Sequence, residues 1–176
     1  MKKIVFGLIG AALIGLASCG NTPSGEKSVS IPCSGSKYRT DKKHFRAAGI
    51  GESLDQMTSV KKAESNAKAR LAGYIESTMK VVGDNYVNST EFNNKEEITE
   101  TFQENARTVV NQVLAGVAVV CEEQTLTSGK KGAQSKYKTY MAIEVATDDI
   151  VGALNSKLSK DEKLKAMYNY ESFKST

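Results

Sequence analysis

The sequence has no tryptophan, a single histidine and only three cysteines among its 176 residues. Tryptophan faces build many sugar-binding platforms, and histidine is the usual residue for acid–base and metal chemistry, so both kinds of site have little material here. Basic residues number 24 and acidic residues 20. This balance argues against nucleic acid or an anionic surface as the main partner. The composition favours a binding or structural protein without a cofactor.

The familiar catalytic motifs are also missing. Gly49-x-Gly51 lacks the third glycine of a dinucleotide-binding loop. No cysteines are spaced as C-x-x-C, so a zinc site would have to combine Cys33, Cys121, His44 and distant acids. No serine lies in a nucleophile elbow, which leaves cell-wall hydrolysis as a remote alternative. We therefore expect neither enzymatic activity nor a metal site.

The remaining charged groups have structural explanations. His44 is flanked by basic residues and is interpreted as a strand-edge residue. Adjacent acids point to opposite faces of a strand or cap the start of a helix. Such pairs are Glu96-Glu97, Glu122-Glu123 and Asp148-Asp149. A further group gathers at an expected hairpin tip, namely Lys130, Lys131, Lys136 and Lys138. We interpret it as a solvated turn, with contact to acidic lipid headgroups or a polyanionic envelope polymer as the alternative.

The most specific pattern lies at the amino end. Two lysines precede an apolar run at residues 4–17, which as a helix would span ~21 Å, short of the ~30 Å hydrocarbon core of a bilayer. Leu16-Ala17-Ser18-Cys19 resembles the lipobox of bacterial lipoproteins. The resemblance implies cleavage before Cys19 and acylation of that residue by membrane lipid, palmitate included. An ordinary secretory signal with a chance cysteine is the alternative.

This pattern predicts three segments: a signal peptide at residues 1–18, a lipidated flexible tether at 19–40, and one domain at 41–176 with a C-terminal helical extension. Cys19 is followed by Gly-Asn-Thr without acidic residues. That absence favours the periplasmic face of the outer membrane. Cys33 and Cys121 would then both lie in an oxidising compartment. Either they form a disulfide, or Cys121 is buried beside Val117 and Val119 and Cys33 is free.

Hydrophobic periodicity predicts an α+β domain with a small antiparallel sheet. The expected strands are 44–51, 117–127 and 136–145; the expected helices are 60–82, 95–114, 148–158 and a last segment at 159–173. The clearest alternation, in the third strand, places Tyr137, Thr139, Met141, Ile143 and Val145 on one face.

Local signals refine these elements. Gly49 and Gly51 indicate that another backbone approaches the first strand closely. Thr58 or Ser59 is expected to cap the long helix, and Gly83 is expected to end it. A loop at 85–94 follows, and Asn94-x-x-Glu97 resembles a capping arrangement. In the second strand, Val117, Val119 and Cys121 are expected to share a face. Ser159-x-x-Glu162 would cap the last segment, where Leu164, Met167, Tyr168 and Phe173 either fold back or bind a partner.

Three stretches, in this order and behind a lipobox, resemble the LPP20-type lipoproteins. They are Phe45-Arg46-Ala47-Ala48-Gly49-Ile50-Gly51, the helix Ala63-Glu64-x-x-Ala67-Lys68-Ala69-Arg70-Leu71-Ala72, and a late hairpin that ends directly in a helix. The resemblance covers about residues 45–158 and implies a modified SHS2-like domain on an outer-membrane-associated lipoprotein. It supplies no catalytic residues.

The resulting hypothesis is a lipid-anchored, non-enzymatic envelope module that binds a protein partner or associates with itself. The alternative is a carrier of a small amphipathic ligand, held in a closed apolar cavity between the sheet and the helix at 60–82.

Overall fold

The computed structural model describes residues 27, 29–89, 94–128, 134–161 and 164. Its elements are a short 3-10 turn η1 (Ser36–Tyr38), strands β1 (His44–Ser53), β2 (Ala118–Thr127) and β3 (Lys136–Ala146), and helices α1 (Gln56–Ser89), α2 (Lys95–Leu114) and α3 (Thr147–Leu158). This order confirms the predicted α+β class.

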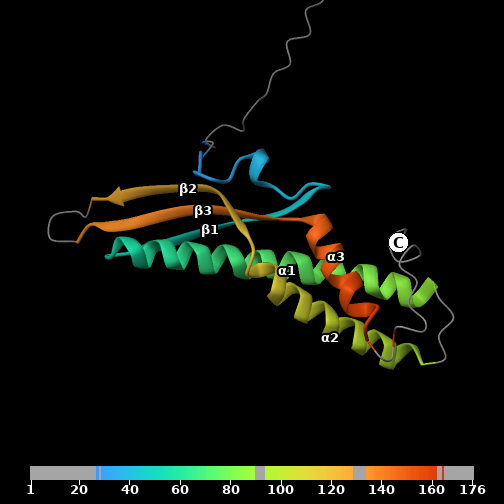
Figure 1. The fold of residues 1–176 in the computed structure, drawn as a ribbon. Helices are drawn as coiled ribbons and strands as arrows, with labels where there is room; N and C mark the ends of the chain where they lie inside the picture. Colours follow the sequence, from blue (N-terminus) through green and yellow to red (C-terminus); the bar gives the residue numbers. More distant parts are fainter. Residues whose placement is uncertain (1–26, 28, 90–93, 129–133, 162–163, 165–176) are drawn as a thin grey trace, which may run out of the picture.

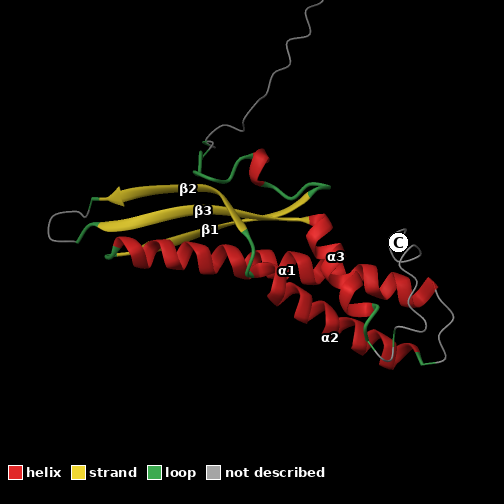
Figure 2. Ribbon diagram, viewed as in Figure 1, coloured by secondary structure: helices red, strands yellow, loops and turns green. Residues whose placement is uncertain are grey.

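The three strands form one antiparallel sheet in the order β1-β3-β2. Helix α1 lies along one face of the sheet and runs on beyond it, where α2 packs beside it and α3 packs against α2 (Figures 1 and 2). The segment before β1 lies on the other face (Figure 1). The core is therefore a two-layer contact under the sheet that continues into a helical end.

The contact between β1 and α1 is a backbone-to-backbone approach. A Cβ atom on Gly49 would collide with the backbone of Ala63 and Ala67, and one on Gly51 with that of Ser59. Only glycine fits there, because any side chain would force the two elements apart. The predicted close packing of this strand under the helix is confirmed. It leaves no room for a ligand between sheet and helix at these positions.

The predicted bounds of the long helix are wrong at both ends. Asp55 Oδ1 accepts the N–H of Thr58 at 2.7 Å and so provides the cap, while Ser59 is fully buried and its hydroxyl lies 2.7 Å from that of Thr139. Gly83 does not end the helix. Its missing side chain makes room for the Phe102 ring of α2, and α1 continues to Ser89.

The extra turns of α1 replace part of the expected loop at 85–94. Tyr86 and Val87 are buried in the core. At the start of α2, the Asn94 side chain donates to the Glu97 carboxylate at 2.7 Å and makes no cap bond to the backbone. The predicted capping arrangement is thus a side-chain contact only.

The β2–β3 pairing and the buried face of β3 are confirmed, with Thr139, Met141, Ile143 and Val145 all buried. The predicted shared face of β2 is wrong. A register shift between Val119 and Cys121 pairs Val119 with Ile143 on the α1 side and Cys121 with Ala142 on the opposite side. The turn with Lys130 and Lys131 lies outside the described residues.

At the C-terminal end, Ser159 closes α3 instead of capping a following helix, and its hydroxyl donates to the Asn155 carbonyl at 2.8 Å. Leu164 is buried in the core, and its N–H is held by Asp161 at 3.2 Å. The other residues of the predicted last segment, Glu162, Met167, Tyr168 and Phe173, lie outside the described residues.

Candidate functional site

A disulfide joins Cys33, which precedes η1, to Cys121 in β2. The two Cα atoms are 5.6 Å apart, within the usual range for such a bond. Of the two alternatives that the sequence left open, the structure has the bonded one. From Cys33 onward, the predicted tether is therefore attached to the sheet. The part of the chain before Cys33 is linked to β2 through this disulfide.

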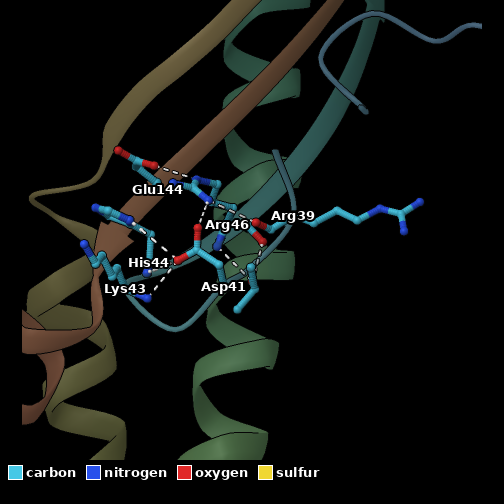
Figure 3. A network of polar contacts seen from close by, with 7 residues as sticks. Arg39, Asp41, Lys43, His44, Arg46 and Glu144 are labelled. Carbon is cyan, nitrogen blue, oxygen red and sulfur yellow. Dashed lines mark hydrogen bonds and ion pairs between the residues drawn. The ribbon is translucent and has the colours of Figure 1, made fainter. Parts of the chain in front are cut away.

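A charged network fastens the next stretch of chain to β1 (Figure 3). Arg46 donates through Nε to Glu144 of β3 and through Nη1 to Asp41, both at 2.6 Å. The other Asp41 oxygen accepts the N–H groups of Lys43 and His44 at 2.8 and 3.0 Å. Every partner is internal, so this network is a structural clamp.

The clamp also sets the protonation of Asp41. Its hydrogen bond from Arg46, followed by the backbone N–H of Lys43, lowers the pKa of the Asp41 carboxyl to about 2. The same contact, with that to Glu144, raises the pKa of Arg46. Both groups are held in their charged forms, which suits a clamp and not a proton-transferring pair.

An open cleft of about 690 Å³ lies beside this clamp, between the segment before β1, the edge of β1 and α1. Its walls combine aromatic and cationic side chains, namely Tyr38, Phe45 and Tyr74 with Arg39, Arg46 and Arg70. Arg46 and Arg70 are engaged by hydrogen bonds within the protein. Among the described residues, the Arg39 guanidinium has no ion-pair partner. This cleft is open and basic, unlike the closed apolar cavity that the alternative hypothesis expects.

The two edges of the sheet differ sharply. Along β1, three α1 side chains one helical turn apart each donate to an outward carbonyl of the strand. The pairs are Arg70 with Ala48 (2.7 Å), Asn66 with Ile50 (2.8 Å) and Lys62 with Glu52 (3.1 Å). The Thr40 hydroxyl bonds both the N–H and the C=O of Arg46 at 3.0 and 3.1 Å. We call this side of β1, from Arg46 to Glu52, the closed edge.

The other edge is the outer side of β2. In an antiparallel sheet, backbone groups of successive residues point alternately to one side and the other. The backbone groups of Ile50 point outward, so those of its partner Tyr140 point away from β1 and toward β2. Glu123 is the β2 partner of Tyr140, and its backbone groups therefore point back to β3. The outward groups of β2 then belong to Glu122, Gln124 and Leu126. We call these three residues the open edge, because no hydrogen bond joins their outward groups to any described residue.

The side chains of β2 are also uncovered. Val119 and Leu126 are 52% and 57% exposed on the face that α1 covers in the other strands. Helix α1 lies under β1 and β3 and contacts β2 chiefly through its first residue, Gln56. Apart from the half-buried Val120 and Cys121, every residue of β2 is exposed.

The charged residues weighed in the sequence have the predicted positions. His44 begins β1, with Nδ1 3.8 Å from Asp41. Glu96-Glu97 and Asp148-Asp149 lie in the first turns of α2 and α3, and Glu122-Glu123 are consecutive in β2. Lys136 pairs with Glu52 at 3.2 Å, and Lys138 lies over the Tyr140 ring.

Ligand atoms of Cys33, Cys121 and Glu123 lie within 4.8 Å of one another. His44, which the sequence weighed with these cysteines, does not belong to this group. Because the disulfide occupies both sulfurs, the group offers one carboxylate and no thiolate. It does not fit zinc while the bond is intact.

Sequence reasoning missed the Arg46 clamp and the two unlike edges. Both depend on residues far apart in the chain, such as Arg46 with Glu144 and Asn66 with Ile50. The only local signal was the run Glu122-Glu123, which sets charge on both faces of an expected strand.

The protein-family models contain no match to this chain, and no curated protein matches its sequence. No described helix is both long and apolar enough to cross a bilayer.

Proposed function

We propose that the chain is a lipoprotein anchored in the outer membrane through acylated Cys19, and that its periplasmic domain binds another envelope protein without catalysing a reaction. One observation carries this proposal: the Cys33–Cys121 disulfide ties the segment that follows the lipobox directly to β2, the uncovered strand of the sheet. A structural disulfide suits an exported protein, since cytosolic thiols are kept reduced.

Anchoring would strengthen a weak interaction. An amino-terminal cysteine carrying several acyl chains exceeds the two-signal level that stable membrane binding requires. Because Cys33 is fixed to the sheet, residues 19–32 are the longest stretch that can act as a tether, and as a coil they would span roughly 20 Å. The domain would then meet envelope partners at a high effective concentration. The LPP20-type and SHS2-like relationship belongs to this proposal and agrees with the α+β topology.

The proposal is tested in intact cells by two measurements. Labelled palmitate should enter the wild-type protein, whereas Cys19→Ser should remain an unprocessed precursor without label. A lysine-reactive crosslinker should join the wild-type protein to a specific envelope protein. Normal labelling of Cys19→Ser would refute the anchor, and crosslinking no stronger than background would refute the protein-binding role.

A second function is favoured by the cleft beside β1. Its aromatic walls and the unpaired Arg39 suit a small amphipathic anion, which would place an acidic group at the guanidinium and an apolar part against Phe45. Titration with a short-chain fatty acid should then show saturable binding that Arg39→Ala weakens. Non-saturable binding, or equal binding by the variant, would exclude this role.

A further inference from the structure

We propose that the open edge of β2 receives an extended segment of a partner protein as a fourth strand, and that this segment carries cationic side chains opposite Glu122 and Glu123. This inference rests on the proposed function, because it names the surface and the partner chemistry of the same module.

The backbone of the open edge is available for pairing. Glu122, Gln124 and Leu126 each present one N–H and one C=O outward, without a described partner. An added strand uses such groups for affinity and reads the flanking side chains for specificity. The closed edge is less suited to pairing, since α1 side chains already occupy its outward carbonyls.

Natural edge strands usually carry features that prevent pairing, such as lysine, proline or a bulge. Between Cys121 and Thr127, β2 has neither lysine nor proline. Its register shift lies before Cys121, and the pairing with β3 is regular from there to Thr127. The regularly paired stretch from Cys121 to Thr127 is thus long enough to receive a strand of about five residues.

Charge complementarity identifies the occupant. Glu122 projects on the α1 side of the sheet, together with Gln124, whose amide oxygen accepts from Gln56 at 2.7 Å. Glu123 projects on the opposite side, beside the disulfide. Both residues are exposed, and neither carboxylate lies within 4.0 Å of a described cationic group, although Lys37 interacts with Glu123 from farther away. A strand with lysine or arginine at two adjacent positions would place one cation beside each carboxylate.

The same charges disfavour a second copy of this chain. Two β2 strands paired antiparallel about Glu123 would set the Glu123 carboxylates of the two copies directly opposite each other, with each Glu122 opposite Gln124 of the other copy. Like charges directly opposite each other destabilise a strand pair. The exposed Leu126, near the end of the strand, instead favours an apolar side chain in the partner next to its cationic pair.

The test uses the full chain in detergent and two labelled ten-residue peptides blocked at both ends. One peptide has two adjacent lysines between valine- and threonine-rich flanks, and the other has two glutamates in their place. We expect the lysine peptide to bind about tenfold more tightly than the glutamate peptide, as fluorescence anisotropy will measure. Bound lysine peptide should slow the amide hydrogen exchange of Glu122, Gln124 and Leu126.

Two variants with a matched control separate the contribution of backbone hydrogen bonds to peptide binding from that of side-chain charge. Gln124→Pro removes one outward N–H that the fold does not use, and it should weaken lysine-peptide binding about tenfold while the circular dichroism spectrum is unchanged. Reversing both charges, Glu122→Lys with Glu123→Lys, should make the glutamate peptide the better ligand. The control, Glu76→Lys with Glu100→Lys, changes net charge equally on exposed helix faces and should keep the original preference.

Several results would overturn the inference: equal binding of both peptides, binding unaffected by Gln124→Pro, protection from exchange away from β2, or a dimer of the chain alone that Gln124→Pro dissociates. If Gln124→Pro does not fold, the exchange map of the wild-type complex decides. Failure of the proposed function has a separate signature, since it is read from crosslinking in cells. A specific crosslinked partner with no peptide binding at β2 would leave that function standing and refute only the added strand.

Discussion

The two edge strands of this sheet differ in whether other parts of the protein cover their outward backbone groups. Along β1, helix α1 comes close enough to contact the backbone of Gly49 and Gly51, and its polar side chains cover the outward carbonyls. Along β2, helix α1 makes contact chiefly through its first residue, Gln56, most side chains are exposed, and the outward backbone groups of the open edge have no described partner. The same domain thus protects one edge and presents the other.

This difference separates stability from interaction. The β1 side joins the close helix contact, the Arg46 clamp and the closed edge, so that changes there should act on folding. The β2 side is fixed to the rest of the molecule by β3, by one disulfide and by the exposed hydrogen bond from Gln56 to Gln124. Apart from loss of the disulfide, changes on the β2 side should act mainly on binding.

The largest effect is expected from a side chain on the closed side. Gly49→Val places its methyl groups in the backbone of α1, and we expect a loss of about 4 kcal/mol or more in the free energy of unfolding. Urea denaturation will measure it. The matched control is Gly73→Ala, where an added Cβ meets open space. It should stabilise the helix by up to about 1 kcal/mol. A mild effect of Gly49→Val would show that the contact is looser than described.

The second largest effect on the free energy of unfolding is expected from the disulfide, which lies on the β2 side. Cys33→Ser with Cys121→Ser should reduce the free energy of unfolding by about 3 kcal/mol, since the bond closes a long loop in the unfolded chain. Hydrogen exchange should accelerate in β2 more than in β1. Equal mass of the wild-type protein alkylated with and without prior reduction would contradict the bond itself.

Part of this arrangement is readable from the sequence. The alternation from Tyr137 to Val145 predicts the buried face of β3, and Gly49 with Gly51 predicts the close helix contact. The continuation of α1 past Gly83 is not readable, because that glycine resembles a helix end and its true role depends on Phe102, which lies in another helix.

The difference between the two edges also cannot be read from the sequence, because it depends on contacts between residues in different elements. Nothing near Asn66 in the sequence indicates that its amide meets the Ile50 carbonyl. The extra residue between Val119 and Cys121 also breaks the alternation that placed them on one face. Of the site, the sequence reveals the residue types and a pattern that resembles a lipobox, but not which strand is left uncovered by the helix.

A smaller effect tests the hydrogen bonds of the closed edge. Asn66→Ala leaves the Ile50 carbonyl without its donor, and we expect a loss of about 1 kcal/mol. On the open edge, Gln124→Ala removes only exposed side-chain contacts with Gln56 and Glu122 and should change stability by less than about 0.5 kcal/mol. Equal losses of stability in the two variants would contradict the proposed difference between the edges.

The smallest expected effect is on the pH dependence of stability in acid. The hydrogen bond from Arg46 lowers the pKa of Asp41 from its ordinary 3.8 to about 2, so the charged form stabilises the folded state above pH ~3.8. That contribution is lost as the pH falls through about 2. Asp41→Asn should therefore be less stable than wild type at neutral pH, and the difference should vanish near pH 2. The control Glu76→Gln removes an exposed carboxylate outside the clamp; thermal unfolding at several pH values will compare them.

The most direct test of the account places a photoreactive amino acid at one exposed position on each edge strand, Gln124 of β2 and Ile50 of β1, in the full-length protein within intact cells. Irradiation should yield a discrete crosslinked product with an envelope protein from position 124 and none above background from position 50. A product of equal yield from position 50, or from position 50 alone, would contradict the claim that β2 is the binding edge.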